Sequence, residues 1–481
     1  MKSRTGYQAV VTSLAFVLAV SVGLADVAPP LWGDRKVVPP WDRKAAPERG
    51  AVVEKQWNPK DYGAKADGIT LDTRAIQAAI DACAGTGGGT VRLEGGIFLS
   101  GTVILKNGVT LLINYDAVLR GSANINDYPS ITPEIDYLYR ARFTKSLIYA
   151  EQQENIGLVG NGVVDGQGPM FPARKGDDGG RPYLLRFSEC KKVRVNGLLF
   201  LNSARWLSHY LACEDVVIER IAIRSRICEN RDGMDVDSCD GVVIRDCDIY
   251  SGDDAIVLKS TAAGRPCRNI KVSGCRLSGR TACLKTGTES QGGFEDILFE
   301  DCCLYDAWSG VEIGTVDGGI CQRVNVSNIV MRNVGVPIFI RLGNRANPLP
   351  GHPKPGVGKM RDITVSNVRA EGAARIGCSV TGIPGHPVER VTLRDIRVRF
   401  SGGGTLADAA RATLERERVY PTGWMFGVLP AFGLYVRHAD GIGLHNLDFQ
   451  VDGEDARPAI VTDIGVSGLE FSGVTPQPHK R

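Results

Sequence analysis

The sequence of 481 residues contains no Cys-x-x-Cys pair, no Gly-Lys-Ser/Thr triplet after its glycine-rich run, and no long apolar stretch beyond its N-terminus. The first absence argues against a zinc site built from cysteine pairs. The second argues against a phosphate-binding loop at residues 85–89, and the third against later membrane spans. An excess of charge of one sign is also missing, since 57 basic residues face 54 acidic ones. We therefore expect neither nucleic acid nor a membrane as a partner.

The first 25 residues have the pattern of an export signal. Lys2 and Arg4 supply a positive start, residues 9–24 are mostly apolar, and small residues precede a cleavage point after Ala25. A membrane anchor is the alternative, but the apolar run is short for a bilayer and a proline-rich polar stretch follows it. We expect cleavage of residues 1–25 and a secreted or periplasmic mature protein.

The rest of the chain divides into a lead-in and one folded domain. Residues 26–55 are rich in proline and charge and are expected to form a linker. Residues 56–481 are expected to form a single domain. Within it, residues 73–83 are predicted to be helical, because apolar residues recur on one face and Asp72 or Thr73 can cap the N-terminus.

Beyond residue 90, short runs rich in Val and Ile recur at a nearly constant interval. The clearest copies are residues 216–221, 242–247, 270–275, 297–302 and 324–329. The interval between the ends of successive copies is in the twenties throughout, and such a period with β-branched cores predicts a solenoid. A leucine-rich repeat would need Leu at fixed places and a helical segment in each unit. The pattern therefore favours an all-β parallel β-helix, with the early helix covering the open end of its first coil.

Thirteen cysteines are present, an odd number that leaves at least one thiol without an intramolecular partner. Six of them recur near the predicted strands at wide, regular intervals: Cys190, Cys213, Cys239, Cys247, Cys275 and Cys302. A free cysteine packs as a small apolar side chain, so we expect several stacked thiols in the core. One or two disulfides remain open as an alternative.

A group of aspartates lies on two neighbouring repeats. Asp232 precedes the pair Asp253 and Asp254 by about one coil with a short turn. Equivalent residues on adjacent coils are about 5 Å apart, so the three carboxylates are expected on one patch of surface. Because close like charges disfavour ionisation, one of them should retain a proton at a higher pH than a free Asp. A protonated carboxyl beside an ionised one suits the hydrolysis of a glycosidic bond.

Other roles for these aspartates compete with catalysis. Asp is common in turns, and a structural role is favoured for Asp237, whereas Asp235 fits either role. Several carboxylates on one face can also bind a calcium ion. Catalysis is favoured for Asp253 and Asp254, because the equivalent residues one coil later are Thr and Ala.

At these residues the chain resembles glycoside hydrolase family 28, the polygalacturonase family. The segment 230–232, Asn-Arg-Asp, is similar to the family's Asn-Thr-Asp motif, and the segment 252–254 matches its Gly-Asp-Asp motif. Residues 61–64 and 87–91 resemble the N-terminal signature of pectin-active β-helices. The resemblance covers nearly all of residues 56–481 and implies a right-handed parallel β-helix that forms one catalytic domain.

The resemblance also implies a mechanism and a class of substrate. Asp253 would be the general acid, and Asp232 and Asp254 would position and deprotonate the attacking water, with inversion at the anomeric carbon. The substrate would be an acidic plant polysaccharide of the pectin type, cleaved at α-galacturonosidic bonds. No cofactor and no metal are required, and we expect a monomer.

Two motifs of the family are absent. Residues 281–283 are Thr-Ala-Cys where Gly-His-Gly is expected, and residues 312–314 are Glu-Ile-Gly where Arg-Ile-Lys is expected. In polygalacturonases those motifs help to bind the uronic acid beside the cleaved bond. Their replacement favours a rhamnogalacturonan or galacturonosidase specificity over plain homogalacturonan, and leaves endo or exo action open.

A uronate substrate still requires positive or polar groups. The candidates for substrate binding are Lys285, Arg341, Lys259, Asn230, His209 and Arg345. A solvated surface charge is the competing interpretation for each cation, and a packed histidine is the competing interpretation for His209. Tyr420, Trp424 and Phe426 lie in a late insertion that is either a sugar-stacking loop or an apolar plug.

Two other functions compete with hydrolysis. A polysaccharide lyase on the same fold would release an unsaturated product that absorbs ultraviolet light. A non-catalytic carbohydrate-binding β-helix would keep the repeat without needing the three aspartates. Hydrolysis is favoured because both motifs are present, in the right order and with the right spacing.

Overall fold

The computed structural model describes residues 55–140, 142–171, 180–227, 230–474 and 478–480. The expected signal at 1–25 and nearly all of the expected linker at 26–55 lie outside the described residues. No helix in the described part of the chain has the length and apolar character that a membrane span requires.

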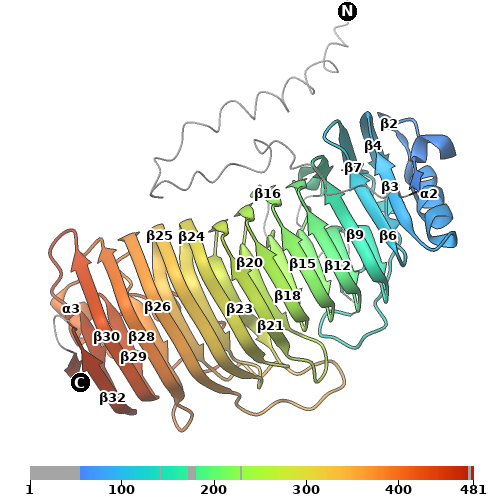
Figure 1. The fold of residues 1–481 in the computed structure, drawn as a ribbon. Coiled ribbons are helices and arrows are strands. Elements are labelled where there is room, and N and C mark those ends of the chain that lie inside the picture. Colours follow the sequence, from blue (N-terminus) through green and yellow to red (C-terminus); the bar gives the residue numbers. More distant parts are fainter. Residues whose placement is uncertain (1–54, 141, 172–179, 228–229, 475–477, 481) are drawn as a thin grey trace, which may run out of the picture. The chain divides into compact units, whose positions relative to one another are not determined.

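The described strands wind into a right-handed parallel β-helix, which confirms the expected fold class (Figure 1). Every pairing between the named strands is parallel, and each strand pairs with its equivalent on the next coil. Each coil contributes to three faces, named here the first, second and third face. In the later coils a single long strand bends around the corners and contributes to more than one face.

The first face contains β5 (Val103–Ile104), β8 (Ser146–Glu151), β11 (Tyr183–Ser188), β14 (Ser208–Leu211), β17 (Met234–Asp237), β20 (Ile256–Ser260), β23 (Ala282–Ser290), the ends of β24 (Phe294–Thr315) and β25 (Ile320–Leu342), β27 (Cys378–Thr381), β29 (Leu434–Arg437), β31 (Ile460–Thr462) and β33 (His479–Lys480). The second face contains β1 (Gln56–Trp57), β3 (Gly89–Leu93), β6 (Val109–Ile113), β9 (Glu154–Gly160), β12 (Lys191–Asn196), β15 (Glu214–Glu219), β18 (Asp240–Arg245), β21 (Cys267–Ser273), the starts of β24, β25, β26 (Lys359–Ala373), β28 (Val388–Phe400) and β30 (Ala439–Val451), and β32 (Val466–Ser472). The third face contains β2 (Asp67–Leu71), β4 (Gly96–Ser100), β7 (Ala117–Gly121), β10 (Val163–Asp165), β13 (Leu199–Leu201), β16 (Ala222–Ser225), β19 (Asp248–Ser251), β22 (Arg276–Gly279) and later parts of β24, β25, β26, β28 and β30.

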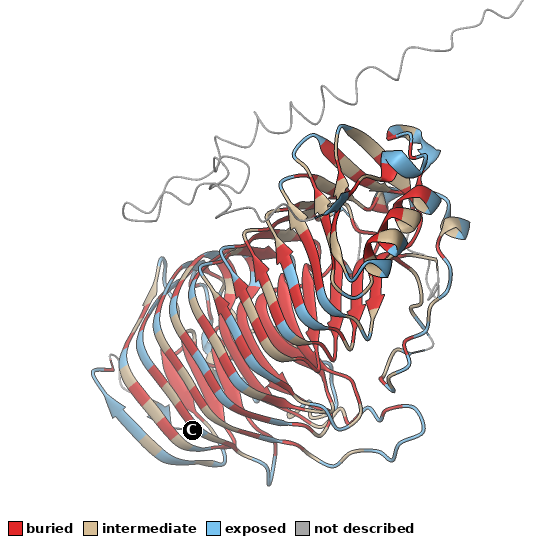
Figure 2. Ribbon diagram, turned by 45° about the vertical axis from the view of Figure 1, so that its right-hand side comes forward, coloured by how far each residue is buried: buried red, intermediate tan, exposed pale blue. Residues whose placement is uncertain are grey.

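The apolar residues of the sequence repeat stack in register inside the coils. One column on the second face consists of Val216, Val242, Ile270, Ile297, Val324, Ile363, Val391 and Ile442. None of these side chains is more than 1% exposed. Along strands of the second face such as β12 and β18, buried residues alternate with more exposed ones (Figure 2), as the period of two in a β-strand requires. The repeat read from the sequence is therefore the repeat of the coils.

The corner between the second and third faces is short and uniform. Two residues separate β15 from β16 and β18 from β19. The first of them has a positive φ on successive coils, at Arg220, Asp246, Gly274, Asp301 and Asn328. Asn and Asp tolerate this left-handed conformation better than most residues, and Asn328 also donates a hydrogen bond to Asp301 at 3.0 Å. The corner therefore repeats with little variation.

The helix α2 (Thr73–Gly85) lies at the N-terminal end of the described coils, where it packs beside β1, β3 and β6 (Figure 1). Its buried face contains Ile76, Ala79, Ile80 and Cys83, which confirms the predicted helix. Asp72 precedes the helix, but its carboxylate accepts hydrogen bonds from the backbone of Lys65 and Ala66 rather than from the first turn. The remaining helical turns are η1 (Pro59–Tyr62), η2 (Ile125–Asp127), η3 (Gly168–Met170) and α3 (Leu406–Ala410).

The twelve cysteines in the described residues are buried, as expected for stacked core thiols, and the eleven described ones from Cys190 onwards are free. The thiol of Cys239 accepts a hydrogen bond from the backbone N–H of Cys213 one coil earlier, at 3.3 Å. Cys275 and Cys302 donate to backbone carbonyls two residues before them. Burial raises the pKa of Cys213 and Cys247, since an apolar surrounding disfavours the thiolate. These thiols therefore fill the core as apolar groups.

Truncation of one inward residue should reveal how much the stacked core stabilises the protein. Ile244 on β18 is buried, whereas its neighbour Val243 points outward and is only partly covered. We expect Ile244→Ala to lower the free energy of unfolding by about 2–5 kcal/mol, because it leaves a cavity between two coils. The control Val243→Ala should cost less than about 1 kcal/mol. Guanidinium unfolding of both variants measures the difference, and equal losses would contradict the core assignment.

Candidate active site

One column of outward-pointing side chains on the first face collects charged groups. Successive coils place His209, Asp235, Val257, Lys285, Glu312 and Phe339 in register. Their neighbours along each strand point into the core, yet none of the charged members is more than 5% exposed. Other segments of the chain must therefore cover this part of the first face.

The two aspartate motifs occupy stacked turns that lead into β17 and β20. The backbone N–H of Gly233 donates to the carbonyl of Asp254 at 2.9 Å, and that of Asp253 donates to the carbonyl of Arg231 at 3.2 Å. A Cβ atom at position 233 would lie only 2.5 Å from the carbonyl oxygen of Ala255, so glycine is required for this close approach. Asp232 therefore lies one coil before Asp253 and Asp254.

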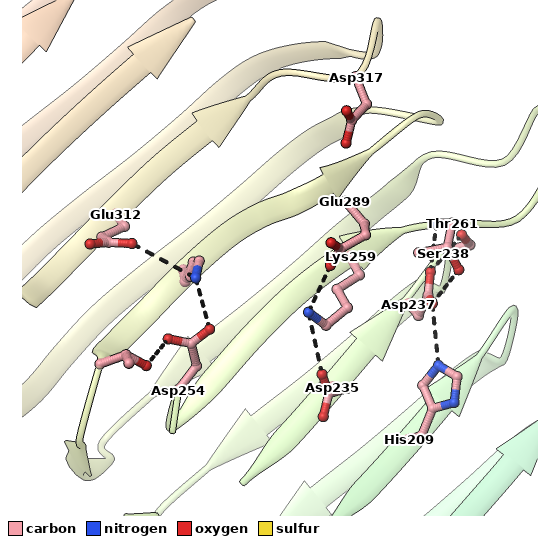
Figure 3. A network of polar contacts seen from close by, with 12 residues as sticks. His209, Asp235, Asp237, Ser238, Asp254, Lys259, Thr261, Glu289, Glu312 and Asp317 are labelled. Carbon is pink, nitrogen blue, oxygen red and sulfur yellow. Dashed lines mark hydrogen bonds and ion pairs between the residues drawn. The ribbon is translucent and has the colours of Figure 1, made fainter. Parts of the chain in front are cut away.

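Asp254 is buried and has a well-defined set of partners (Figure 3). Its carboxylate accepts hydrogen bonds from the backbone N–H of Ala282 at 3.0 Å, from the Thr281 hydroxyl, and from Nζ of Lys285 at 2.9 Å. The ammonium group of Lys285 also lies 3.9 Å from Glu312. The lysine thus compensates two carboxylates in a place shielded from water.

Asp253 differs from Asp254 in its environment. The hydrogen bond to its side chain comes from the Thr281 hydroxyl at 2.7 Å, and no lysine forms an ion pair with it among the described residues. Burial, followed by the charge of Asp254, raises the pKa of Asp253. Burial raises the pKa of Asp232 well above its usual range, and the charges of Asp235 and Asp253 add to this effect. At least one proton is therefore expected within this group of carboxyls.

A second lysine, Lys259, balances the acids on the other side of the column. Its Nζ lies 3.1 Å from Glu289, 3.7 Å from Asp235 and 4.7 Å from the ring centre of Trp206. Burial alone would lower its pKa, but the charges of Glu289 and Asp235 outweigh burial and raise it well above its usual range. Figure 3 shows this lysine between the two acids. Lys259 is therefore a fixed positive charge beside the carboxylate group.

The other residues expected to bind substrate have partners within the protein. Arg341 is 2% exposed and donates to the carbonyls of Gly382 and Glu415, both at 2.8 Å. Burial lowers its pKa to about 10. Arg345 forms ion pairs with Asp317 and Glu289. The two arginines thus connect loops beside the first face.

His209 and Asn230 lie in very different places. His209 is fully buried, its ring stacks on Tyr183, and its Nε2 lies 3.2 Å from Asp237. Burial lowers the pKa of His209 to about 4, so the ring is neutral near pH 7. This is the packed histidine that the sequence left open as an alternative. Asn230 is exposed and accepts a hydrogen bond from Arg181 at 3.4 Å.

Several residues of the site were not singled out as functional from the sequence. Thr281 stands where a family motif is missing, yet its hydroxyl bridges Asp253 and Asp254. Glu312 accepts a hydrogen bond from the backbone of Gly423 at 2.9 Å, which fixes the late insertion to the column. Tyr420 in that insertion, which the sequence did offer as a sugar-stacking residue, has its ring centre 5.6 Å from Nζ of Lys285. The spacing of one coil between Asp253 and Thr281, and between Lys285 and Glu312, was the available signal.

The late insertion serves partly as a plug. Met425, Phe426, Leu429 and Ala431 form a cluster with outward residues of the later coils, namely Val336, Phe339, Tyr435 and Val461. Tyr420, by contrast, is 49% exposed. The apolar cluster therefore fits the interpretation of the insertion as a plug, and the exposed Tyr420 fits its interpretation as a sugar-stacking loop.

No group of His, Cys, Asp and Glu within the described ranges has an arrangement that could hold a metal ion. The ammonium groups of Lys259 and Lys285 lie against the carboxylates that a calcium ion would need.

Comparison with known proteins identifies the family. The model of glycosyl hydrolases family 28 matches residues 118–414. A probable polygalacturonase of Vitis vinifera is 29% identical over an alignment of 372 residues, and the match covers 71% of this chain and 74% of that protein. An exo-poly-alpha-D-galacturonosidase of Dickeya chrysanthemi is 36% identical over an alignment of 160 residues, and the match covers 31% of this chain and 26% of that protein. The chain therefore belongs to glycoside hydrolase family 28 and is a glycoside hydrolase that acts on O-glycosyl bonds.

Solved structures agree with this fold. The family 28 exopolygalacturonase of Yersinia enterocolitica aligns with a TM-score of 0.70 at 20% identity, over 86% of this chain and 78% of that chain. An exopolygalacturonase of Thermotoga maritima aligns with a TM-score of 0.65 at 20% identity, over 82% of this chain and 92% of that chain.

The buried ion pairs of the column should make stability depend on pH. Burial tends to raise the pKa of Glu289, but the charges of Lys259 and Arg345 prevail and lower it to about 2. The resulting stabilisation is complete above about pH 4.5 and is lost as the pH falls towards 2. We expect Glu289→Gln to lower the free energy of unfolding by about 3 kcal/mol near pH 7.

The difference between the wild type and Glu289→Gln should shrink as the pH falls below the ordinary pKa of glutamate. Denaturant unfolding at a series of pH values measures it. Glu470 is exposed at the C-terminal end, so Glu470→Gln is the matched control and should change little. A loss in Glu289→Gln that does not depend on pH would contradict the ion-pair account.

Proposed function

We propose that this chain hydrolyses α-galacturonosidic bonds in a pectic polysaccharide, with Asp253 as the general acid. Asp232 and Asp254 position the attacking water and take its proton. Departure of the leaving sugar and attack of water occur on opposite faces of the ring, so the anomeric configuration inverts. The reaction needs no cofactor, because the carboxyl groups supply both the acid and the base.

The unequal environment of two adjacent carboxyls carries this proposal. Asp254 contacts a lysine ammonium and a backbone N–H, which suits a carboxylate. Asp253 lacks such an ion pair in the described part of the chain, and burial raises its pKa, which suits a proton donor. Two neighbouring groups with different protonation are the requirement for acid and base catalysis at one bond.

The substrate is proposed from the relatives and from the charge of the site. Proteins similar to this chain are named polygalacturonases and galacturonosidases. Glu312 lies next to Lys285 in the column, so that lysine is already neutralised where a uronate carboxylate would otherwise bind. This favours a rhamnogalacturonan or a galacturonosidase substrate over plain homogalacturonan.

Export is part of the same proposal. The charged start, the apolar run and the small residues before position 26 support a cleavable signal. A secreted or periplasmic location would bring the enzyme to a polymer that is too large to enter a cell. We propose that the mature protein acts as a monomer.

Loss of the general acid gives the most direct test. We expect Asp253→Asn to lower kcat on rhamnogalacturonan or polygalacturonate at least about 100-fold, because a leaving group without a proton donor departs slowly. Asp246→Asn is a matched control on the same coil, since Asn tolerates the positive φ found at that turn. New reducing ends and ultraviolet absorbance are followed together on both polymers.

Reducing ends without absorbance, lost in Asp253→Asn and kept in Asp246→Asn, support hydrolysis. Growth of an ultraviolet-absorbing product in the wild type would instead identify a lyase. The ratio of kcat/KM on the two polymers and the size of the products test the proposed specificity, and a strong preference for polygalacturonate with cleavage inside the chain would contradict it.

The pH profile should respond to Lys259. The positive charge of this lysine lowers the pKa of both Asp232 and Asp253. Its removal in Lys259→Met should raise both pKa values and move the kcat profile to higher pH by on the order of one unit. Lys271→Met, which breaks an exposed ion pair on the second face, should leave the profile in place. A shift to lower pH would refute this role of Lys259.

A further inference from the structure

A tryptophan pair and an arginine stand at the margin of the carboxylate group. Trp308 on β24 is 50% exposed, and its ring meets the edge of Trp424 with centroids 4.7 Å apart at 87°. The guanidinium of Arg280, an exposed residue, lies 5.7 Å from the centre of the Trp308 ring. Isolated exposed aromatic residues are common, but this one is paired with a second ring and a cation.

The backbone connects this group directly with the catalytic turn. Arg280 precedes Thr281, whose hydroxyl binds Asp253 at 2.7 Å. Trp308 precedes Ser309, whose N–H donates to the carbonyl of Thr281 at 2.8 Å. The arginine and the tryptophan are therefore on the next two coils beyond Asp253, at the same corner of the solenoid.

Trp424 is held in place by the residue before it. The N–H of Gly423 donates to Glu312 at 2.9 Å. A Cβ atom at position 423 would lie 2.6 Å from the hydroxyl of Ser309 and 3.0 Å from Val336, so the insertion approaches β24 and β25 closely there. Its apolar residues then cover the outward side of the following coils. A sugar chain that leaves the aspartates in this direction thus meets the tryptophan pair and then a packed wall.

We propose that Trp308, Trp424 and Arg280 form a subsite that binds a uronic acid residue of the substrate next to the cleaved bond. The proposal rests on the hydrolase function given above. The aromatic face of Trp308 stacks on the apolar C–H face of the pyranose ring. The guanidinium of Arg280 binds the carboxylate of the sugar, for which its fork of N–H groups is suited.

This subsite supplies an exposed positive charge, which the column on the first face lacks. There, Lys285 is neutralised by Asp254 and Glu312, and Lys259 by Glu289 and Asp235. Arg280 is exposed instead, with its guanidinium 5.7 Å from the centre of the Trp308 ring. The subsite therefore explains how an enzyme without the usual cationic motif can still select an acidic sugar.

Binding to an inactive enzyme tests the subsite without turnover. The full chain carrying Asp253→Asn is titrated with trigalacturonate and with its methyl-esterified form by calorimetry. We expect Trp308→Ala in this background to weaken both ligands about tenfold, because it removes the stacking surface. Trp308→Phe should keep affinity within about threefold. Arg280→Gln should weaken trigalacturonate by about tenfold and leave the esterified trimer unchanged.

Tyr115→Ala is the matched control, because Tyr115 is 78% exposed and lies on an early coil. Unchanged affinity in both Trp308→Ala and Arg280→Gln would overturn the subsite, as would a parent protein that binds neither trimer. Equal losses on the two trimers in Arg280→Gln would overturn the role given to its charge.

The wild type is assayed in parallel for new reducing ends, so that the two proposals are separated. Trimer binding that depends on Trp308, without hydrolysis of either rhamnogalacturonan or polygalacturonate by the wild type, would refute the proposed function and leave these residues as a uronate-binding site only. Hydrolysis by the wild type without any effect of Trp308→Ala on binding or on KM would refute the subsite and keep the function.

Discussion

Each coil of this protein forms its backbone hydrogen bonds with the coil before it, and this registered stacking decides where the functional side chains lie. Parallel pairing without slippage sets each residue about 5 Å above its equivalent. The stacking of coils alone thereby brings together the two aspartate motifs, which are one coil apart. The same register aligns Lys285 with Glu312 and Asp235 with Val257. The candidate active site is thus formed by side chains on neighbouring coils of one solenoid.

Stacking also brings carboxylates close together, and other side chains of the site compensate their negative charge. Carboxylates in consecutive coils repel one another, and burial makes their charge more costly. Lysines on the same face supply compensation for Asp254 and for Glu289. Where compensation is incomplete, at Asp253 and Asp232, the pKa rises instead. In the proposed mechanism, the lysine next to Asp254 suits that residue to act as the base, and the raised pKa of Asp253 suits it to act as the acid.

Much of this could be predicted from the sequence, because the interval of the repeat directly reports the geometry. The coil period, the cap at 73–85 and the position of the aspartates all follow from local patterns. The roles of Arg341 and Arg345 could not be read in that way, since their partners lie in loops whose paths no periodicity describes. His209 shows the same limit, because its ring packs against Tyr137 and Tyr183 from two other segments as well as against the nearby Trp206. Trp308 and Trp424 are far apart along the chain, and only the folded insertion reveals that they meet.

The two-residue corner between the second and third faces has a consequence for how such an enzyme can diversify. An extra residue there would displace the register of later strands, whereas the corners beside the first face tolerate long excursions. Phe339, Ser379 and Tyr435 stand on successive coils although the segments that connect them are longer than the repeat and differ in length. The loops beside the first face can thus vary in length. The uniform corner between the second and third faces keeps the strands of successive coils in register. Substrate preference can therefore be altered by exchanging loops, without rebuilding the core that holds the aspartates.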